Sequence, residues 1–327
     1  METSMQVRRR QFLGALGAAV CCSAMPFRQA RANPPLRMLV GFAPGGAADM
    51  VARALAEGMR ASGYTTIVEN KAGAGGRIAV DSLLSAGADG NSVLFTPSTN
   101  LTLYPHLYKD LRYTTADFTP LGTASEFDFA FAVGANSPAR TLQEFLQLAQ
   151  KDERMAVYGT PGAGTVMNFL GIMLANASKV PLTPIPYKGG SPALADTVSG
   201  TLPALITTLP NLIPMHKSGK IRILATTGSA PSPALPDVPT FAAAGYPSLT
   251  MAEYFTLLGH KGLPDSQAQA LSRAVADAAR SPAFEKVMQQ QFFETKVTAP
   301  AALKQQLERE YAFWDRVVKD SDYRPEA

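Results

Sequence analysis

Short apolar runs alternate with segments of helical periodicity along most of this chain. Each run is only a few residues long and is bounded by Gly, Pro or polar residues, which indicates buried strands. The predicted strands cover residues 37–42, 65–70, 92–96, 127–133, 155–159, 183–187, 202–207, 221–227 and 254–259. Repeated strand–helix–strand units predict an α/β fold with mainly parallel sheets covered on both faces.

Segments with helical spacing of apolar residues follow these strands. The predicted helices are 47–62, 75–86, one after the capping-box sequence Thr141-Leu142-Gln143-Glu144, two from about Thr165 and Ser191, and finally 266–280, 283–290 and 300–319. The last three follow a single strand and cannot build a sheet of their own, so we expect them to cover the first part of the chain.

This order of elements predicts two lobes. We expect lobe 1 to comprise residues 33–133 plus 251–327 and lobe 2 to comprise 134–250, with the chain crossing between them near Val133–Ser137 and Pro247–Tyr254. The total length also favours two domains. A cleft between two such lobes is a natural place for a ligand.

The first residues have the layout of an export signal. Arg8, Arg9 and Arg10 precede an apolar run over residues 12–24, and Ala30-Arg31-Ala32 offers small residues for cleavage after Ala32. The run is too short for a transmembrane helix. Residues 1–32 therefore predict a signal peptide and a periplasmic protein. The sequence RRQFL resembles a twin-arginine signal, although an ordinary Sec signal also begins with basic residues.

Removal of this segment changes the composition of the chain. It takes away five arginines and one glutamate, so the net charge of +4 falls to zero, and it takes away both cysteines, Cys21 and Cys22. A neutral mature chain argues against nucleic acid as a partner. Without cysteine, the mature chain can have no disulfide, no thiol nucleophile and no cysteine-ligated metal.

A glycine-rich joint links the first predicted strand to the first predicted helix. It reads Phe42-Ala43-Pro44-Gly45-Gly46-Ala47 and is followed by Asp49. Free N–H groups and the helix dipole at such a joint favour a carboxylate or phosphate. Asp49 either complements the dipole or receives a ligand hydroxyl or ammonium group.

Two further joints of this kind occur in the predicted second lobe. The stretch from Tyr158 to Phe169 places Gly162 and Gly164 between a strand and a helix, with hydroxyls on Thr160 and Thr165. The stretch PYKGGSPALAD contains Tyr187, which could close over a ligand, and Asp196, which either is structural or contacts the ligand. Two anion-binding helix ends facing each other across a cleft would suit a dianion.

A simpler interpretation is that these glycines only make turns. None of the joints matches a nucleotide-binding motif. The three histidines, His106, His216 and His260, lack metal-site spacing, and no serine lies in a G-x-S-x-G elbow. We therefore predict no metal, no cofactor and no catalytic residue.

An ordered series of motifs resembles the Bug-type receptors, the extracytoplasmic substrate-binding proteins of tripartite tricarboxylate transporters. The series is PGGAAD, ENKAGAGGRIA, YKDLRYTTADFTPLG, GTPGAGT, YKGGSPALAD, SGKIRILATT and LPDVPTFAAAGYP. It extends over nearly all of the mature chain, from about Leu36 to Val318. The resemblance implies a periplasmic binding protein fold with two α/β lobes around a ligand cleft.

The resemblance also implies a set of ligand-binding residues. The loop from Pro44 to Asp49 would hold a ligand carboxylate, and Gly162–Thr165 would contribute from the other lobe, with Tyr187 and Asp196 nearby. Ser98 and Asn100 match a further pocket-lining stretch. Asn168 stands where family members often carry histidine, and the region around Glu253-Tyr254 lacks a tryptophan common in the family.

These observations predict a monomeric, non-catalytic receptor. It would capture a small carboxylate, such as a di- or tricarboxylate, an amino acid or an aromatic acid, and would deliver it to membrane transporter subunits or present it to a sensor kinase. The alternatives are an exported hydrolase or isomerase acting on a carboxylate, and a scaffold protein without a ligand.

Overall fold

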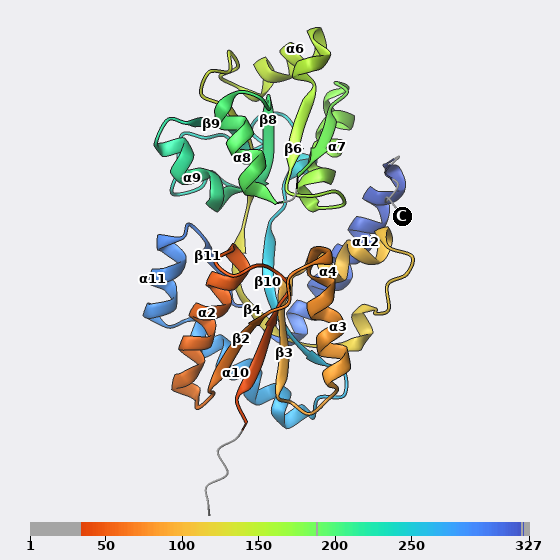
Figure 1. Cartoon of the computed structure of the whole chain (residues 1–327), viewed down its shortest axis with the longest axis vertical. Helices are drawn as coiled ribbons and strands as arrows, with labels where there is room; N and C mark the ends of the chain where they lie inside the picture. Colours follow the sequence, from red (N-terminus) through yellow and green to blue (C-terminus); the bar gives the residue numbers. More distant parts are fainter. Residues whose placement is uncertain (1–33, 188, 322, 324–327) are drawn as a thin grey trace, which may run out of the picture. The chain divides into compact units, whose positions relative to one another are not determined.

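The computed structural model describes residues 34–187, 189–321 and 323, so the predicted signal peptide lies outside the described residues. Pro35–Ala327 forms one compact unit. Its strands make two separate sheets, each with its own helices (Figure 1). No helix in the described part of the chain is long and apolar enough to cross a membrane.

The first sheet has six strands in the order β11-β4-β10-β3-β1-β2. These are β1 (Leu36–Val40), β2 (Thr66–Asn70), β3 (Ser92–Pro97), β4 (Phe118–Phe127), β10 (Glu253–His260) and β11 (Glu294–Thr295). β1 pairs in parallel with β2 and β3, whereas β10 pairs antiparallel with β3 and β4. The loops that follow β1, β2 and β3 therefore leave the same edge of the sheet.

The second sheet has five strands in the order β7-β6-β8-β5-β9. These are β5 (Phe129–Gly134), β6 (Val157–Thr160), β7 (Thr183–Pro186), β8 (Ala204–Thr208) and β9 (Ile221–Thr226). β6 is parallel to β7 and β8, and β5 is antiparallel to β8 and β9. Both sheets are therefore mixed, and the prediction of mainly parallel sheets was wrong.

Helices follow the strands closely. Those of the first sheet are α2 (Ala47–Met59), α3 (Arg77–Ala86), α4 (Thr99–Thr102), α5 (Tyr104–Leu107), α10 (Asp265–Ala279), α11 (Pro282–Gln290) and α12 (Pro300–Asp320). Those of the second are α6 (Leu142–Lys151), α7 (Val166–Ser178), α8 (Gly190–Ser199) and α9 (Leu209–Lys217). Short 3₁₀ turns are η2 (Arg60–Ser62), η3 (Ala74–Gly76), η4 (Thr115–Asp117), η5 (Glu153–Met155) and η6 (Pro247–Leu249).

Each sheet is covered on both faces because its strands alternate two sets of buried side chains. In β1, Met38 and Val40 share a core with α2, α10 and α11, whereas Leu39 shares a core with α3 and α12. Both faces of β5 are likewise buried, with Phe131 packed toward α6 and Ala132 toward α8 and α9. The prediction that the last three helices cover the first sheet is confirmed.

The chain passes from the first sheet to the second at Asp128, between β4 and β5. We predicted this crossing near Val133–Ser137 and assigned residues 129–133 to lobe 1, but β5 pairs only with strands of the second sheet. The error arose because β4 was not predicted, since Pro120 and Gly122 interrupt its apolar pattern. The division into lobes itself stays a prediction, with its first boundary moved to Asp128.

Candidate functional site

The loop after β1 presents an open helix N-terminus. Gly45 has a φ of 79°, a left-handed conformation that favours glycine, and Gly46 precedes α2 without any side chain that caps the helix. Residues 43–46 are exposed, whereas Phe42 and Ala47 are half-buried. The N–H groups of the first turn of α2 therefore lie beside exposed backbone, as predicted from the sequence.

Asp49 holds this loop in place through hydrogen bonds. Its Oδ2 accepts hydrogen bonds from the Gly45 N–H at 2.8 Å and from Arg53 Nε at 2.9 Å. Its Oδ1 accepts one from Asn70 Nδ2 at 2.9 Å, and the same Asn70 nitrogen donates to the Phe42 carbonyl at 3.0 Å. Asp49 is only 3% exposed, so its carboxylate is committed to the protein.

The charge of Asp49 is held in place by these contacts. Burial alone would raise the pKa of Asp49, but hydrogen bonds from Arg53, Gly45 and Asn70 together outweigh burial and hold the pKa below its ordinary value of 3.8. The sequence suggested that Asp49 complements the helix dipole or receives a ligand group, and the structure adds a further role in holding Gly45. Contact of Asp49 with a ligand stays a prediction. Asp49 fixes the backbone that a ligand would meet.

The loops after β2 and β3 join the same edge. Gly76 precedes α3 with a φ of 98°, and a Cβ placed on Gly41 would collide with its backbone. A Cβ on Gly76 would lie 2.7 Å from the Nδ2 atom of Asn100, so this amide is packed against the glycine. Asn100 is 1% exposed and its Nδ2 has no hydrogen-bond partner within the described residues.

Ser98, which we expected to line the ligand pocket, forms its hydrogen bond within the protein. Its hydroxyl donates to Glu253 Oε1 at 2.8 Å, and the Thr99 N–H donates to the same oxygen at 3.2 Å. Both residues are buried. Ser98 therefore holds a buried carboxylate of β10, while Asn100, one turn further on, keeps a free amide.

The second group of predicted residues gathers after β6 and β7. The hydroxyls of Thr160 and Thr165 both donate to the Gly162 carbonyl, at 3.1 and 2.8 Å. Thr165 Oγ1 also accepts the Asn168 N–H at 3.3 Å and so caps α7. Gly164 has a φ of 67°. Both hydroxyls thus shape the turn. Ala163 is exposed in it, whereas Gly162 and Thr165 are half-buried and Gly164 is buried.

Tyr187 and Asp196 meet beside this turn. The Tyr187 hydroxyl donates to Asp196 Oδ2 at 2.8 Å, and the Tyr187 N–H donates to the Thr160 carbonyl at 2.9 Å. Burial, followed by the contact with Asp196, holds the pKa of Tyr187 above its ordinary value of 10.0. Asn168 is 2% exposed, and its Oδ1 has no partner among the described residues.

The structure thus brings the predicted residues into two groups, one on each sheet. A Cβ on Gly164 would lie 3.2 Å from Leu107 Cδ1 and 3.5 Å from the Tyr108 hydroxyl, so the second turn touches the segment around α5. That the two groups face each other across a ligand cleft stays a prediction.

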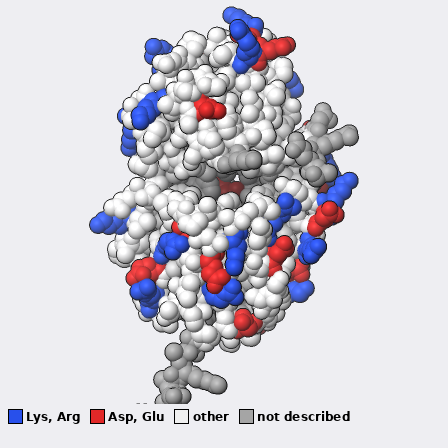
Figure 2. All heavy atoms as spheres, viewed as in Figure 1, with Lys and Arg blue, Asp and Glu red and all other residues white. Residues whose placement is uncertain are grey.

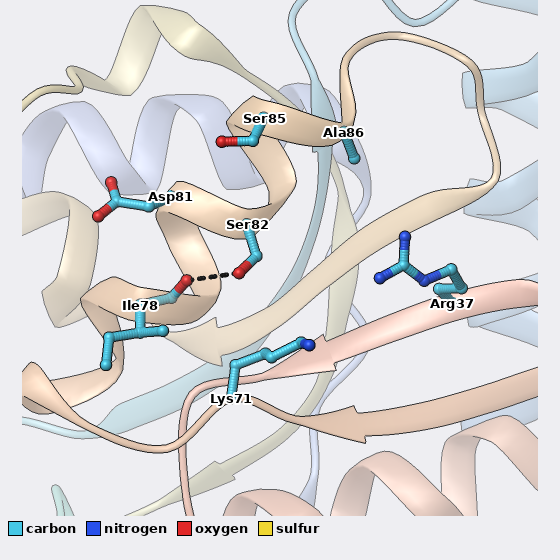
Figure 3. A pocket seen from close by; sticks show the side chains of 7 residues that line it. All are labelled: Arg37, Lys71, Ile78, Asp81, Ser82, Ser85 and Ala86. Atoms are coloured by element: carbon cyan, nitrogen blue, oxygen red, sulfur yellow. Dashed lines mark hydrogen bonds between the residues drawn. The ribbon is translucent and has the colours of Figure 1, made fainter.

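Two hollows lie outside the glycine loops proper. One, of about 440 Å³, opens beside α3 (Figure 3) and is lined by Arg37, Lys71, Ile78, Asp81, Ser82, Ser85 and Ala86. Arg37 already pairs with Glu69 at 2.7 Å, and Ser82 donates to the Ile78 carbonyl. This hollow contains none of the predicted site residues. The other, of about 280 Å³, includes Ser98 and is described below.

The described residues offer few other side chains that could form a catalytic or metal-binding site. His216 Nδ1 accepts the Ile223 N–H, and His260 Nδ1 accepts the Gly262 N–H, so both histidines serve local turns. Among the described residues, no group of three or more His, Cys, Asp or Glu is arranged to hold a metal ion. On the face drawn in Figure 2, charges of both signs intermix over the elements of the first sheet.

Solved structures of periplasmic binding proteins match this chain and its two mixed sheets. The periplasmic binding protein BugD is 30% identical and aligns with a TM-score of 0.81 over 90% of this chain and 99% of its own. MatC of Rhodopseudomonas palustris with bound malate is 26% identical, with a TM-score of 0.79 over 88% and 99%. Rpa4515 of R. palustris with adipate is 26% identical, with a TM-score of 0.82 over 90% and 99%.

The family is identified by a second comparison. Residues 51–322 match the model of the tripartite tricarboxylate transporter family receptors. The chain belongs to this family, so the predicted resemblance to Bug-type receptors is confirmed, as is the two-lobed α/β fold class. The family and the fold are those of periplasmic solute-binding proteins.

Three residues of the site were not predicted. Asn70 ties the first loop to Asp49, Gly76 lets Asn100 approach α3, and Glu253 receives Ser98. The stretch NKAGAGG carried a signal for the first two, because an asparagine at a strand end with three glycines among the next six residues indicates a functional turn. The sequence offered no comparable signal for the partner of Glu253.

Proposed function

We propose that this chain is a periplasmic receptor that captures a small carboxylate at the joint between β1 and α2. The observation that carries the proposal is the braced loop: Asp49 fixes Gly45, and the N-terminus of α2 is left without a capping side chain. A helix N-terminus with ordered free N–H groups is a binding site for an anion. The unpartnered Asn100 amide supplies a further donor on the same sheet edge.

The second group of residues supplies the other wall. The turn from Thr160 to Thr165, together with Asn168, Tyr187 and Asp196, closes over the ligand, and closure brings the two sheets together around it. The relatives solved with malate and adipate support an aliphatic dicarboxylate as the first class to test. The captured ligand passes to membrane transporter subunits or is presented to a sensor kinase, after export with cleavage following Ala32.

The test is a thermal-shift screen of purified residues 33–327 with mono-, di- and tricarboxylates, amino acids and uncharged analogues. A ligand at 100 times its dissociation constant adds about 2.7 kcal/mol to the free energy of unfolding. We expect such a rise for one carboxylate class only. No rise for any carboxylate, in protein shown by mass spectrometry to be free of ligand, would refute the proposal.

A matched pair of glycine variants locates the site. Gly45 and Gly63 have φ values of 79° and 83°, and a Cβ on either would meet nothing within 4 Å. Gly45→Ala and Gly63→Ala therefore impose the same backbone strain at opposite ends of the segment formed by α2 and η2. We expect only Gly45→Ala to weaken carboxylate binding, by tenfold or more. Equal affinities in both variants would remove this loop from the site.

A receptor and an enzyme differ in turnover. We propose that the chain is not an enzyme, because it belongs to a family of solute-binding receptors. The Ser98 hydroxyl does donate to the Glu253 carboxylate, but both residues are buried and Ser98 is only 2% exposed, so it is poorly placed to attack a substrate. Incubation of excess ligand with catalytic amounts of protein should return the ligand unchanged. Any steady conversion would favour the exported hydrolase or isomerase instead.

A further inference from the structure

A second cavity lies where the chain passes between the two sheets. Its volume is about 280 Å³. The two segments that connect the sheets supply Glu126 and Phe129 and the run Thr250, Met251, Ala252 and Glu253. The start of α4 supplies Ser98 and Thr99, and the start of α7 supplies Val166. Helix α12 supplies Gln306, Glu310, Phe313 and Trp314. The lining contains three glutamates and no Lys, Arg or His.

Two of these glutamates have no positive partner. Glu126 pairs with Lys296 at 3.2 Å, but neither Glu253 nor Glu310 forms an ion pair with any described residue. Glu310 accepts hydrogen bonds from Gln306 Nε2 at 2.9 Å and from the Tyr254 hydroxyl at 3.0 Å. Two acids therefore border the cavity without an ion-pair partner among the described residues, and the charge of Arg309 acts on Glu310 only at a distance.

Glu253 has an unused acceptor. It is 5% exposed, and both of its hydrogen bonds, from Ser98 and Thr99, end on Oε1. No hydrogen bond of standard geometry from a described residue ends on its Oε2, although the Thr99 side chain lies close enough to help lower the pKa of Glu253. Burial, opposed in part by the Ser98 bond and aided by the charge of Glu310, raises the pKa of Glu253 to about 7. A buried carboxyl group that faces a cavity in this state is stabilised in its charged form by an added cation.

Aromatic side chains form the other wall. Trp314 is 4% exposed, and its ring lies 5.1 Å from Phe313 and 6.0 Å from Phe169, measured between centroids. Phe129 lines the cavity from β5. Aromatic faces attract ammonium ions, and Trp does so most strongly. An anion would meet three glutamates in this lining and no Lys, Arg or His.

We propose that this cavity binds the ammonium group of a small organic amine, with Glu253 Oε2 as its main hydrogen-bond acceptor and Trp314 as part of its apolar wall. A volume of about 280 Å³ equals roughly nine water molecules at 30 Å³ each, which is enough for an amine of amino-acid size. A primary ammonium brings three N–H donors to a wall rich in acceptors.

The ammonium group can come from two sources. It can belong to a separate amine, or it can belong to an amino acid whose carboxylate is held by the α2 loop, in which case the inference rests on the proposed function. Ser98 and Asn100 make the second source geometrically reasonable, because they lie on one turn and face the cavity and the glycine loops respectively. The two sources are separated by the choice of probe.

The assay uses the single tryptophan of the chain, which lines the cavity. Trp314 fluorescence is titrated with n-butylamine, γ-aminobutyrate, n-butanol and butyrate in separate experiments. We expect saturable changes with the two amines and none with butanol. We expect Glu253→Gln to weaken amine binding at least tenfold and Glu308→Gln, an exposed acid on the same helix as Trp314, to leave it unchanged.

A second readout distinguishes a binding role from a structural one. When an ammonium ion binds near pH 7, Glu253 ionises and releases a proton, which appears as a dependence of the calorimetric heat on the ionisation heat of the buffer. Glu253→Gln should abolish this release. The other charged and titratable groups around the cavity are Glu310, Tyr254, Arg309 and Glu126 with its partner Lys296.

The outcomes divide as follows. If Gly45→Ala weakens γ-aminobutyrate but not butylamine, the ammonium belongs to an amino-acid ligand; if it weakens neither, the cavity is a separate amine site. Absence of saturable binding by either amine, or an amine affinity equal to that of the wild type in a Glu253→Gln variant that melts as a folded protein, would overturn the inference. A rise in thermal stability with a carboxylate in the screen described above would support the proposed function whatever the results with the amines.

Discussion

Replacement of Asp49 by alanine tests the brace under the first glycine loop. The substitution leaves the Gly45 N–H without its acceptor and removes one acceptor each from Asn70 Nδ2 and Arg53. Asn70 Nδ2 keeps its hydrogen bond to the Phe42 carbonyl, and Arg53 Nη2 keeps the one to Asn70 Oδ1. A hydrogen bond to a charged group contributes about 1.5–3 kcal/mol. The Arg53 side chain is 53% exposed and the Gly45 N–H can reach water, so their shares are reduced by solvent. We expect a net loss of about 2–3 kcal/mol.

The measurement is urea unfolding followed by circular dichroism, with thermal melts in parallel. A loss of this size lowers the melting temperature by roughly 5 °C or more. Glu57→Gln is the control on the same helix: Glu57 pairs with Arg60 at 3.2 Å, but both side chains are about 70% exposed, and such pairs contribute under about 1 kcal/mol. If Asp49→Ala costs no more than Glu57→Gln, the brace does not stabilise the loop.

The pH dependence gives an independent check on the same reasoning. Because the pKa of Asp49 is lowered in the folded protein, its stabilising effect is present above the ordinary value of 3.8 and is lost as the pH falls through the folded value. The difference between wild type and Asp49→Ala should therefore be constant from pH 5 to 8 and shrink below 3.8. A difference that stays constant into the acid range would contradict the assignment of a charged Asp49.

Four further substitutions follow from the contacts of the described residues. Gly171→Ala places a Cβ against the ring of Tyr158 and should cost roughly 1–3 kcal/mol in urea unfolding. Thr165→Ala and Thr141→Ala each remove a helix cap worth about 1 kcal/mol, but only the former should also weaken ligand affinity by calorimetry. Burial raises the pKa of Asp128 to about 7, so its cost appears as the pH rises from 3.8 through 7, and Asp128→Asn should gain on wild type between pH 4 and 8 in melts.

The sequence pattern predicted the elements that follow simple rules. The start of α6 was predicted at Thr141, whose Oγ1 accepts the Glu144 N–H at 3.2 Å, although the Glu144 carboxylate reaches back to the Arg140 N–H and not to that of Thr141. β4 escaped prediction because Pro120 and Gly122 are unfavourable in strands. The pairing of β4 with β10 accommodates them through register shifts, which only tertiary structure specifies.

The glycine joints of the site were predicted because glycine signals backbone exposure locally. The partners of Asp49 were not, since an acid in the first turn of a helix looks the same whether it receives a ligand or holds a loop. Asn70 lies 21 residues away and Ser98 lies 155 residues from Glu253. Such pairings depend on which strands become neighbours, and β3 and β10 become neighbours only through the return of the chain from the second sheet.

The turn from Ser98 to Asn100 carries two kinds of hydrogen-bond donor: those that bind the Glu253 carboxylate and one that has no acceptor. The Ser98 hydroxyl and the Thr99 N–H both donate to Glu253. The Asn100 carbonyl accepts a hydrogen bond from the Tyr113 hydroxyl, whereas Asn100 Nδ2 donates to no group of the described residues. A buried donor without an acceptor costs about 1–3 kcal/mol. A carboxylate oxygen at the joint after β1 that accepted a hydrogen bond from Asn100 Nδ2 would remove that cost. Ligand binding would then be more favourable by the same free energy. Asn100→Leu, which removes the unpaired donor, should then stabilise the ligand-free chain while weakening carboxylate binding.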